Sequence, residues 1–337
     1  MKICSLLPSG TEILFALGLG DSVVGVSDLC VYPPETAAKP VVSRSRIDVD
    51  SMSSEEVEER MRQILASGES PYELDVEWLW KNPPDVVLTQ DLCYFCEVDA
   101  AAVGRAIEGM PACPEVVVLQ PKTLGQILDT IHEIGKACGV KAEAQRLVDD
   151  ISQRIDAVTD RLALAENRPR AYSLEGINPL VIGGHWIPEM LTLAGGNTLH
   201  PPGCPARRVE WEEVRDYAPE RLFIDLCSSD IPRSLREAPW LAGQEGWHDI
   251  PAVKAGEVYL IDHQYFSCPG PRVAQGLEIL AELTHPDLFE GMVPSGAVVK
   301  LEPNLDDPPA PGQIAGRFVP YTQVAIADWH PPGRPEP

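Results

Sequence analysis

The sequence has no run of eighteen or more apolar residues, and it is poor in positive charge. Without such a run, no segment is long enough to span a membrane as a helix. The chain carries 51 Asp and Glu against 27 Lys and Arg, a formal net charge of -24. Because so acidic a surface repels nucleic acid and anionic lipid, neither is expected as a partner. The charge fits either plain solvation or docking to a basic protein.

Common catalytic motifs are also missing. The sequence has no G-x-S-x-G nucleophile elbow, no Walker A loop, no H-E-x-x-H zinc motif and no G-x-G-x-x-G after a predicted strand. These absences argue against a hydrolase, an NTPase and a dehydrogenase. We therefore expect a binding protein rather than an enzyme.

Nine cysteines are spread along the chain, and this odd, scattered set does not indicate a disulfide framework. It fits a reducing compartment. The N-terminal apolar run is interrupted by Ser9, Thr11 and Glu12, and no small-residue cleavage site follows it. A secretory signal peptide would have an uninterrupted apolar run followed by such a cleavage site, so the expected location is the cytoplasm. A periplasmic or other extracytoplasmic location is expected if the start of the chain has been trimmed.

Short apolar segments alternate with helical patterns along most of the chain, which indicates parallel strands joined by helices. The pattern predicts one α/β lobe over residues 1–139 and a second over residues 167–289. Between them, residues 140–166 have apolar side chains at three- and four-residue steps, which predicts one long linking helix. The alternative is an ordinary surface helix of a single domain. Residues 290–337 are rich in proline and predict a C-terminal tail.

Two distant stretches share the form of a short apolar strand, a polar turn and a helix: Lys2–Asp21 and Gly256–Arg272. With Thr89–Cys93, Gly184–Trp186 and Val209–Val214, they resemble the helical-backbone substrate-binding proteins of ABC transporters for vitamin B12 and iron complexes. The resemblance runs to about residue 289. It implies an α/β fold of two lobes, each with a parallel sheet flanked by helices, joined by one long rigid helix. We expect a monomer with its ligand between the lobes.

The polar turns after the predicted strands should meet at one edge of each sheet, where α/β proteins bind ligands. Their aromatic side chains can wall a flat macrocycle, or can simply pack against their own lobe. Arginine side chains can bind polar groups at the rim of the ligand, or can pair with the many carboxylates. The expected ligand-binding residues are Ser9, Thr11, Cys30, Tyr32, Arg44, Arg46, Asp91, Leu92, Tyr94, Phe95, His185, Trp186, Cys227, Tyr265, Phe266 and Arg272.

Two features of the sequence suggest a metal. The Cys93-Tyr94-Phe95-Cys96 motif suits a zinc or redox site, but no second pair close in sequence completes a tetrahedral set. Cys93 and Cys96 are therefore either metal ligands or small hydrophobic residues of a turn. His185 is either an axial ligand to the metal of a bound complex or a packing residue before a helix.

The resemblance makes cobalamin or another corrinoid the expected ligand, with a ferric siderophore or haem as the alternative. A further alternative is an enzyme or chaperone that uses cleft thiols to handle a metal or corrinoid. In relatives linked to a transporter, one Glu on each lobe docks onto the permease, and by local pattern these residues are Glu77 and Glu212. Both lie at predicted helix starts, where a carboxylate is favourable in any case.

Overall fold

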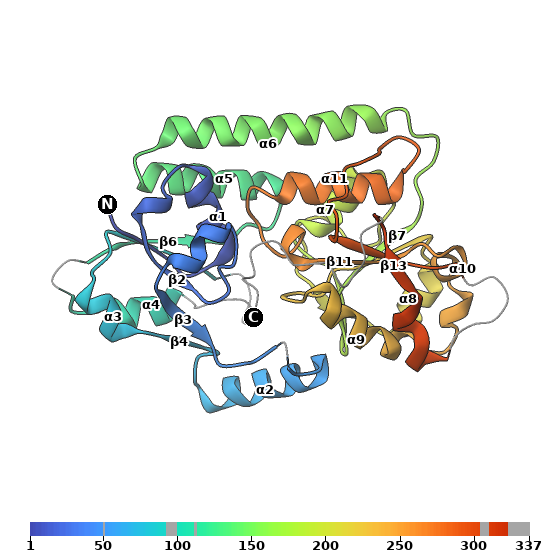
Figure 1. Cartoon of the computed structure of the whole chain (residues 1–337), viewed down its shortest axis with the longest axis horizontal. Coiled ribbons are helices and arrows are strands. Elements are labelled where there is room, and N and C mark those ends of the chain that lie inside the picture. Colours follow the sequence, from blue (N-terminus) through green and yellow to red (C-terminus); the bar gives the residue numbers. More distant parts are fainter. Residues whose placement is uncertain (50, 92–99, 111–112, 304–309, 323–337) are drawn as a thin grey trace.

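The structure is a computed structural model that describes residues 1–49, 51–91, 100–110, 113–303 and 310–322. Two α/β lobes stand side by side under one long helix, α6, which passes over both (Figure 1). Each lobe has a sheet with helices packed around it. The predicted fold class is therefore confirmed.

The first lobe is built on a six-stranded sheet in the order β4-β3-β2-β1-β5-β6. Neighbouring strands from β3 to β6 in this order are parallel, and β4 runs antiparallel at the edge. The strands are β1 Ile3–Ser5, β2 Val23–Ser27, β3 Val41–Ser45, β4 Tyr72–Leu74, β5 Val86–Gln90 and β6 Glu115–Leu119. The helices are α1 Pro8–Ala16, η1 Gly20–Ser22, η2 Pro34–Ala38, α2 Ser54–Ser67, α3 Val76–Lys81, α4 Ala100–Ile107 and α5 Leu124–Ala137.

Helix α1 begins directly after β1, where the sequence predicted a polar turn. Pro8 occupies the first helical turn, in which its missing N–H costs no hydrogen bond. The Thr11 hydroxyl donates to the carbonyl oxygen of Leu7 at 3.1 Å, inside the helix. Ser9 and Thr11 are therefore helical residues, and both are buried.

The second lobe has a seven-stranded sheet in the order β13-β12-β11-β10-β7-β8-β9. The pairs of β10 with β7 and β11 are parallel, whereas the outer strands pair antiparallel. The strands are β7 Ala171–Ile177, β8 Leu180–Ile182, β9 Arg207–Arg208, β10 Arg221–Ile224, β11 Val258–Ile261, β12 Val298–Leu301 and β13 Phe318–Pro320. The helices are α7 Ile187–Leu193, α8 Trp211–Tyr217, α9 Ile231–Ala242, η3 Trp247–Asp249, α10 Pro251–Ala255, η4 His263–Tyr265, α11 Val273–Thr284 and η5 Pro311–Arg317.

The chain beyond residue 289 contributes to the second lobe, although its composition predicted only a tail. Strand β12 pairs with β11, and β13 pairs with β12. Between them, η5 packs against α9. The described part of this segment therefore extends the second sheet, while the domain boundaries given above stay a prediction.

Helix α6, Lys141–Leu162, packs against α5 of the first lobe and α11 of the second. Its 22 residues give a length of about 33 Å at ~1.5 Å per residue. One continuous cluster of buried side chains includes Leu14 and Ile131 of the first lobe, Ile151 of α6, and Leu191 and Leu277 of the second. The two lobes therefore share a core beneath α6.

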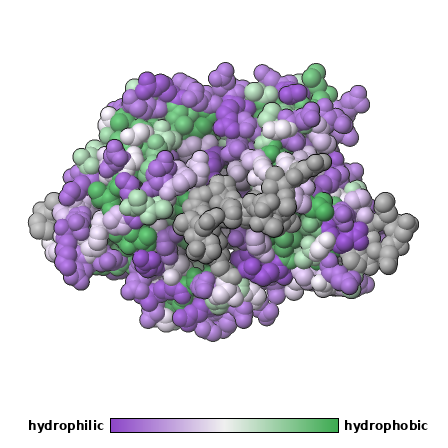
Figure 2. All heavy atoms as spheres, in the orientation of Figure 1, coloured by the Kyte–Doolittle hydropathy of each residue, from purple (hydrophilic) through white to green (hydrophobic). Residues whose placement is uncertain are grey.

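The surface is mainly polar on one face of the molecule (Figure 2). On the face drawn in Figure 2, hydrophilic side chains predominate over both lobes and over α6. Within the ranges that the structure describes, no helix combines the length and the apolar character needed to cross a membrane.

Candidate functional site

A cavity with two adjoining parts lies between the lobes, at the carboxyl ends of the central strands. The first part has a volume of about 480 Å³ and the second about 680 Å³, both within the range of small-molecule sites. Side chains of both lobes line each part. The parts adjoin because both are lined by Leu29, Ser45, Ile47, Val49, Gln90, Cys227, Ser228, Ser267 and Pro269.

The turn that carries His185 and Trp186 is pressed against another loop of the second lobe. A side chain at Gly184 would place its Cβ only 2.0 Å from the backbone nitrogen of Ala206, so only glycine fits. The His185 N–H donates to the carbonyl oxygen of Cys204 at 2.6 Å, and His185 has a positive φ of 55°. These contacts hold the imidazole at the cavity wall.

His185 is half-buried, and Trp186 is buried with its indole N–H donated to the carbonyl oxygen of Phe266 at 2.8 Å. The two rings lie 5.9 Å apart between centroids. Burial lowers the pKa of His185, and positive charge on Lys122 lowers it further. The imidazole is therefore neutral near pH 7, the form that can bind a metal.

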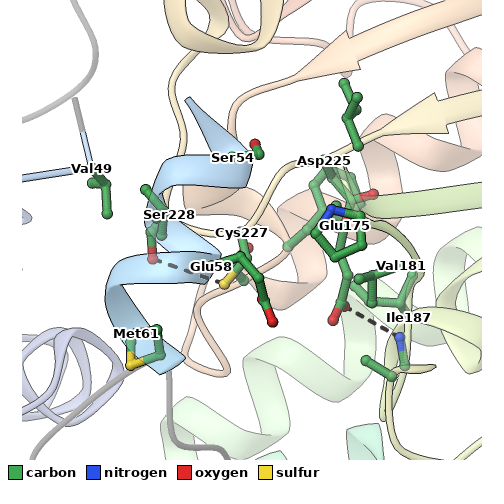
Figure 3. A pocket seen from close by; sticks show the side chains of 18 of the residues that line it. Val49, Ser54, Glu58, Met61, Glu175, Val181, Ile187, Asp225, Cys227 and Ser228 are labelled. Carbon is green, nitrogen blue, oxygen red and sulfur yellow. Dashed lines mark hydrogen bonds between the residues drawn. The ribbon is translucent and has the colours of Figure 1, made fainter. Parts of the chain in front are cut away.

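Two carboxyl groups form a polar wall of the first part of the cavity. Glu175, near the end of β7, accepts a hydrogen bond from the Gly184 N–H at 3.3 Å, and Asp225, just after β10, accepts one from the Ser173 hydroxyl at 2.6 Å. Burial raises the pKa of Glu175 to about 8, and the neighbouring Cys227 adds to this shift. Burial also raises the pKa of Asp225 well above its usual range. In the view of Figure 3, Glu175 and Asp225 lie on one side of Cys227 and Ser228 lies on the other.

A buried ion pair joins the lobes in the second part of the cavity. The Arg272 guanidinium donates to both carboxylate oxygens of Glu12, at 2.5 and 3.0 Å, and the side chains are 11% and 3% exposed. Arg272 also lies over the Tyr32 ring at 4.2 Å, and the Cys268 thiol donates to Glu12 at 3.3 Å. Burial raises the pKa of Glu12 against the opposing effect of Arg272. Since Glu12 belongs to α1, this contact ties the first lobe to the second.

The structure brings eight of the predicted ligand-binding residues to the cavity. They are Ser9, Tyr32, Arg46, His185, Trp186, Cys227, Phe266 and Arg272. The residues come from both lobes and lie at or near strand ends, as the alternation of strands and helices predicted. Their roles in ligand binding stay a prediction.

Five other predicted ligand-binding residues do not line either part of the cavity. Thr11 and Cys30 are buried beneath it, with a hydroxyl–sulfur distance of 3.1 Å. Arg44 is exposed on β3, opposite the edge strand β4. Asp91 is also exposed, and its carboxylate accepts a hydrogen bond from the Gln120 amide. Tyr265 is buried behind Arg272, which lies 5.6 Å from its ring.

The remaining predicted site residues lie outside the part of the chain that the structure describes. They are Leu92, Cys93, Tyr94, Phe95 and Cys96. Among the described residues, no group of three or more His, Cys, Asp or Glu side chains is arranged to hold a metal ion. The expected metal role of Cys93 and Cys96 therefore stays a prediction.

Both predicted docking carboxylates lie in the first turn of a helix and are exposed. Glu77 belongs to α3 and forms an ion pair with Lys81 four residues later. Glu212 belongs to α8 of the other lobe. Their positions agree with the local reading of the sequence, and their role in docking stays a prediction.

The sequence reasoning missed the contribution of α2 to the cavity. Val57, Glu58 and Met61 of this helix line the first part. The one available signal was a capping box, in which Ser53 and Glu56 satisfy each other's backbone N–H groups at the helix start. That signal predicts a helix but does not indicate the surface on which it packs.

The chain is similar to several known proteins. Residues 3–265 match the family described as "Periplasmic binding protein". An uncharacterized ABC transporter substrate-binding lipoprotein of Bacillus subtilis (strain 168), YvrC, is 25% identical over 295 residues, covering 86% of this chain and 81% of the relative. The vitamin B12-binding protein of Vibrio cholerae serotype O1 (strain ATCC 39541) is 24% identical over 282 residues, covering 82% and 86%.

A solved structure with a similar fold is the periplasmic heme-binding protein RhuT from Roseiflexus sp. RS-1 in its apo form. The TM-score is 0.65 at 21% identity, and the alignment covers 86% of this chain and 99% of that one. At this identity the likeness shows the fold alone.

These comparisons contradict the expected cytoplasmic location. The matching family is described as periplasmic, and the Bacillus relative is a lipoprotein. The expectation rested on an interrupted apolar run near the N-terminus. Residues of that run form β1 and α1, so their pattern records the fold of the first lobe and carries no information on targeting.

The comparisons agree with the expectation of a binding protein rather than an enzyme. The Bacillus relative is named as a substrate-binding lipoprotein of an ABC transporter, and the Vibrio relative as a vitamin B12-binding protein. The family match begins in β1, includes α6 and ends in η4, so it covers most of the chain. The chain therefore belongs to the periplasmic binding protein family.

Proposed function

We propose that the cavity between the lobes binds cobalamin or another corrinoid for an ABC transporter. A corrinoid is a large ring with apolar methyl groups and a rim of uncharged amides. Such a ligand needs apolar walls and many hydrogen-bonding groups, but it does not need unpaired cations. Ile47, Trp186 and Phe266 provide apolar surface, and Gln90 and Ser228 provide polar groups beside it.

The observation that carries this proposal is the charge of the cavity. Seven carboxyl residues and five arginines are among its described lining residues. Most of these arginines already have acceptors: Arg207 pairs with Glu213, Arg208 with Glu58 and Arg272 with Glu12. Because burial raises the pKa of Glu175 and Asp225, the charged carboxylates and the arginines of the lining nearly balance. The propionates of haem, or the acidic groups of many ferric siderophores, would therefore find few cations that lack an acceptor. An amide-rich, uncharged rim would meet hydrogen-bond acceptors instead.

Haem is the second candidate, and His185 is the observation that favours it. Its neutral imidazole lies at the cavity wall and could ligate iron. The same imidazole could equally ligate the cobalt of a corrinoid. His185 therefore supports a metal–macrocycle in general, while the surrounding charge favours the corrinoid.

Docking to the permease is proposed through the exposed carboxylates Glu77 and Glu212. They lie on different lobes, so the fit of one partner that contacts both would depend on the distance between the lobes. We also propose the predicted division into a first lobe, a linking helix and a second lobe, because α6 packs on both.

Visible absorbance titrations with cobalamin, cobinamide and haem would test the ligand class. We expect both corrinoids to bind with micromolar or tighter affinity, about 8 kcal/mol at 1 μM, and haem to bind more weakly. A His185→Gln variant should keep corrinoid binding but lose any ligand-field change in the spectrum that arises from the imidazole. Tight haem binding with no corrinoid binding would select the second candidate, and no response to any of the three would contradict both.

A further inference from the structure

Helix α2 belongs to the first lobe in sequence, but it lies across the gap between the lobes. It connects β3 and β4, and in Figure 1 it lies below both sheets, on the side opposite α6. The cavity is thus bounded by the shared core on one side and by α2 on the other.

The contacts of α2 with the second lobe are polar. The Ser54 N–H donates to the Glu237 carboxylate at 2.8 Å, and the Asn178 amide donates to Glu55 at 3.3 Å. Glu58 forms an ion pair with Arg208, whose side chain is 65% exposed. Polar contacts that remain partly in water exchange readily with solvent, so they can break at little cost.

The apolar face of α2 packs within a small cluster of its own. Met61 and Ile64 of the helix are buried with Ile47, and this cluster is separate from the three larger ones. The capping box at Ser53 and Glu56 also satisfies the start of the helix locally. A unit with a small separate core and its own cap can open without unfolding the lobe.

Several side chains of α2 face the cavity. Val57, Glu58 and Met61 line its first part together with Cys227 and Ser228 of the second lobe. Figure 3 shows Glu58 and Met61 on α2 beside these two residues. A ligand in the cavity would therefore contact both α2 and the second lobe.

We propose that α2 is a movable wall of the ligand site, which contacts the ligand through Val57 and Met61 and is held closed by the Glu58–Arg208 pair. Its release from the second lobe opens the cavity for entry and exit of the ligand. The proposal rests on the proposed function only in taking this cavity as the ligand site. The chemistry of the contact, one thioether and one aliphatic side chain, suits the apolar face of a ring rather than its amide rim.

Native-state alkylation of Cys227 tests the movement without any ligand. Iodoacetamide labelling of the whole chain, followed peptide by peptide, should modify the exposed Cys113 faster than Cys227. We expect Glu58→Arg to raise the Cys227 rate about two- to fivefold, because it replaces an attraction by a repulsion. The double variant Glu58→Arg/Arg208→Glu should restore the parent rate. Glu59→Arg is the matched control, since Glu59 pairs with Arg62 within the helix and faces solvent.

Stopped-flow dissociation of cobinamide from the same four proteins gives the second measurement. The release rate should rise in Glu58→Arg, return in the double variant and stay unchanged in Glu59→Arg. Equal Cys227 rates in Glu58→Arg and Glu59→Arg, or a parent Cys227 as reactive as Cys113, would overturn the movable wall. Failure of the parent to bind cobinamide would count against the proposed function, while the alkylation rates would still decide the movement of α2.

Discussion

At the scale of single residues, the carboxyl of Glu175 is the clearest case of an environment that changes a group's chemistry. Burial raises its pKa to about 8, whereas a Glu in an unfolded chain titrates near 4.3. Between these pH values the folded protein holds a proton that the unfolded chain has released. The free energy of unfolding therefore falls as the pH rises from about 4.5 to 8, and the full cost is present above that range.

Replacing Glu175 by Gln should remove this cost while keeping an acceptor for the Gly184 N–H. We expect Glu175→Gln to raise the free energy of unfolding by about 2–4 kcal/mol near pH 9 and by little near pH 5. Denaturant unfolding at both pH values measures the difference. The charge of Glu175 also raises the pKa of Asp225, so part of the effect of Glu175→Gln at pH 9 is transmitted through Asp225. Glu59→Gln, on the exposed face of α2, should follow the parent. An equal effect of Glu175→Gln at the two pH values would contradict the shifted pKa.

Residues of the candidate site were predicted where their position follows from chain alternation alone. Tyr32, Cys227 and Phe266 follow β2, β10 and β11, and parallel strands bring such ends to one edge. Glu175 near the end of β7 and Asp225 just after β10 were not predicted as site residues, because acidic side chains are usually exposed to solvent. Their burial depends on the opposite wall of the cavity, which local sequence does not encode.

At the scale of elements, the Glu12–Arg272 pair between α1 and the segment before α11 should contribute strongly to stability. Removing one partner of a buried pair leaves an uncompensated charge, at a cost of about 3–5 kcal/mol. We expect Arg272→Met to lower the free energy of unfolding by this amount, as measured in denaturant. The double variant Glu12→Gln/Arg272→Met should recover much of the loss.

The matched control for this pair is Arg154→Met. Arg154 pairs with Glu278 between α6 and α11, but its side chain is 43% exposed. Exposed pairs contribute about 0–1 kcal/mol, so the control should lose little. Equal losses in Arg272→Met and Arg154→Met would show that burial between the lobes does not strengthen the Glu12 contact.

Helices and strands were largely predictable because hydrophobic periodicity records which face of each element is buried. The long helix predicted at 140–166 is α6, Lys141–Leu162. Periodicity does not record the partner of that face. Helix α2 therefore gave no indication that it faces a cavity, and the short strands β12 and β13 were hidden in a segment whose proline content dominated its composition.

At the scale of the whole molecule, the two lobes behave as one packed body on the α6 side. Leu14 of the first lobe, Ile151 of α6 and Leu277 of the second belong to one buried cluster. A shared core leaves little freedom for one lobe to rotate against the other. Access to the cavity must then depend on a smaller unit, and α2 is such a unit because its buried residues Met61 and Ile64 belong to a separate small cluster.

The location of the ligand between the lobes can be tested by filling the cavity. Val181 on β8 lines the first part, whereas Val319 on β13 of the same sheet is 40% exposed and lines neither part. A Trp at position 181 would occupy space that the ligand needs, and a Trp at position 319 would extend into solvent. The two substitutions are chemically identical and differ only in what they face.

Calorimetric titration of cobinamide into the parent, Val181→Trp and Val319→Trp is the most direct measurement of a corrinoid site between the lobes. We predict micromolar or tighter binding to the parent and to Val319→Trp, and binding weakened about tenfold or more in Val181→Trp, a loss of ~1.4 kcal/mol or more. Absence of binding heat with the parent, or equal affinities of the two Trp variants, would contradict a corrinoid site between the lobes.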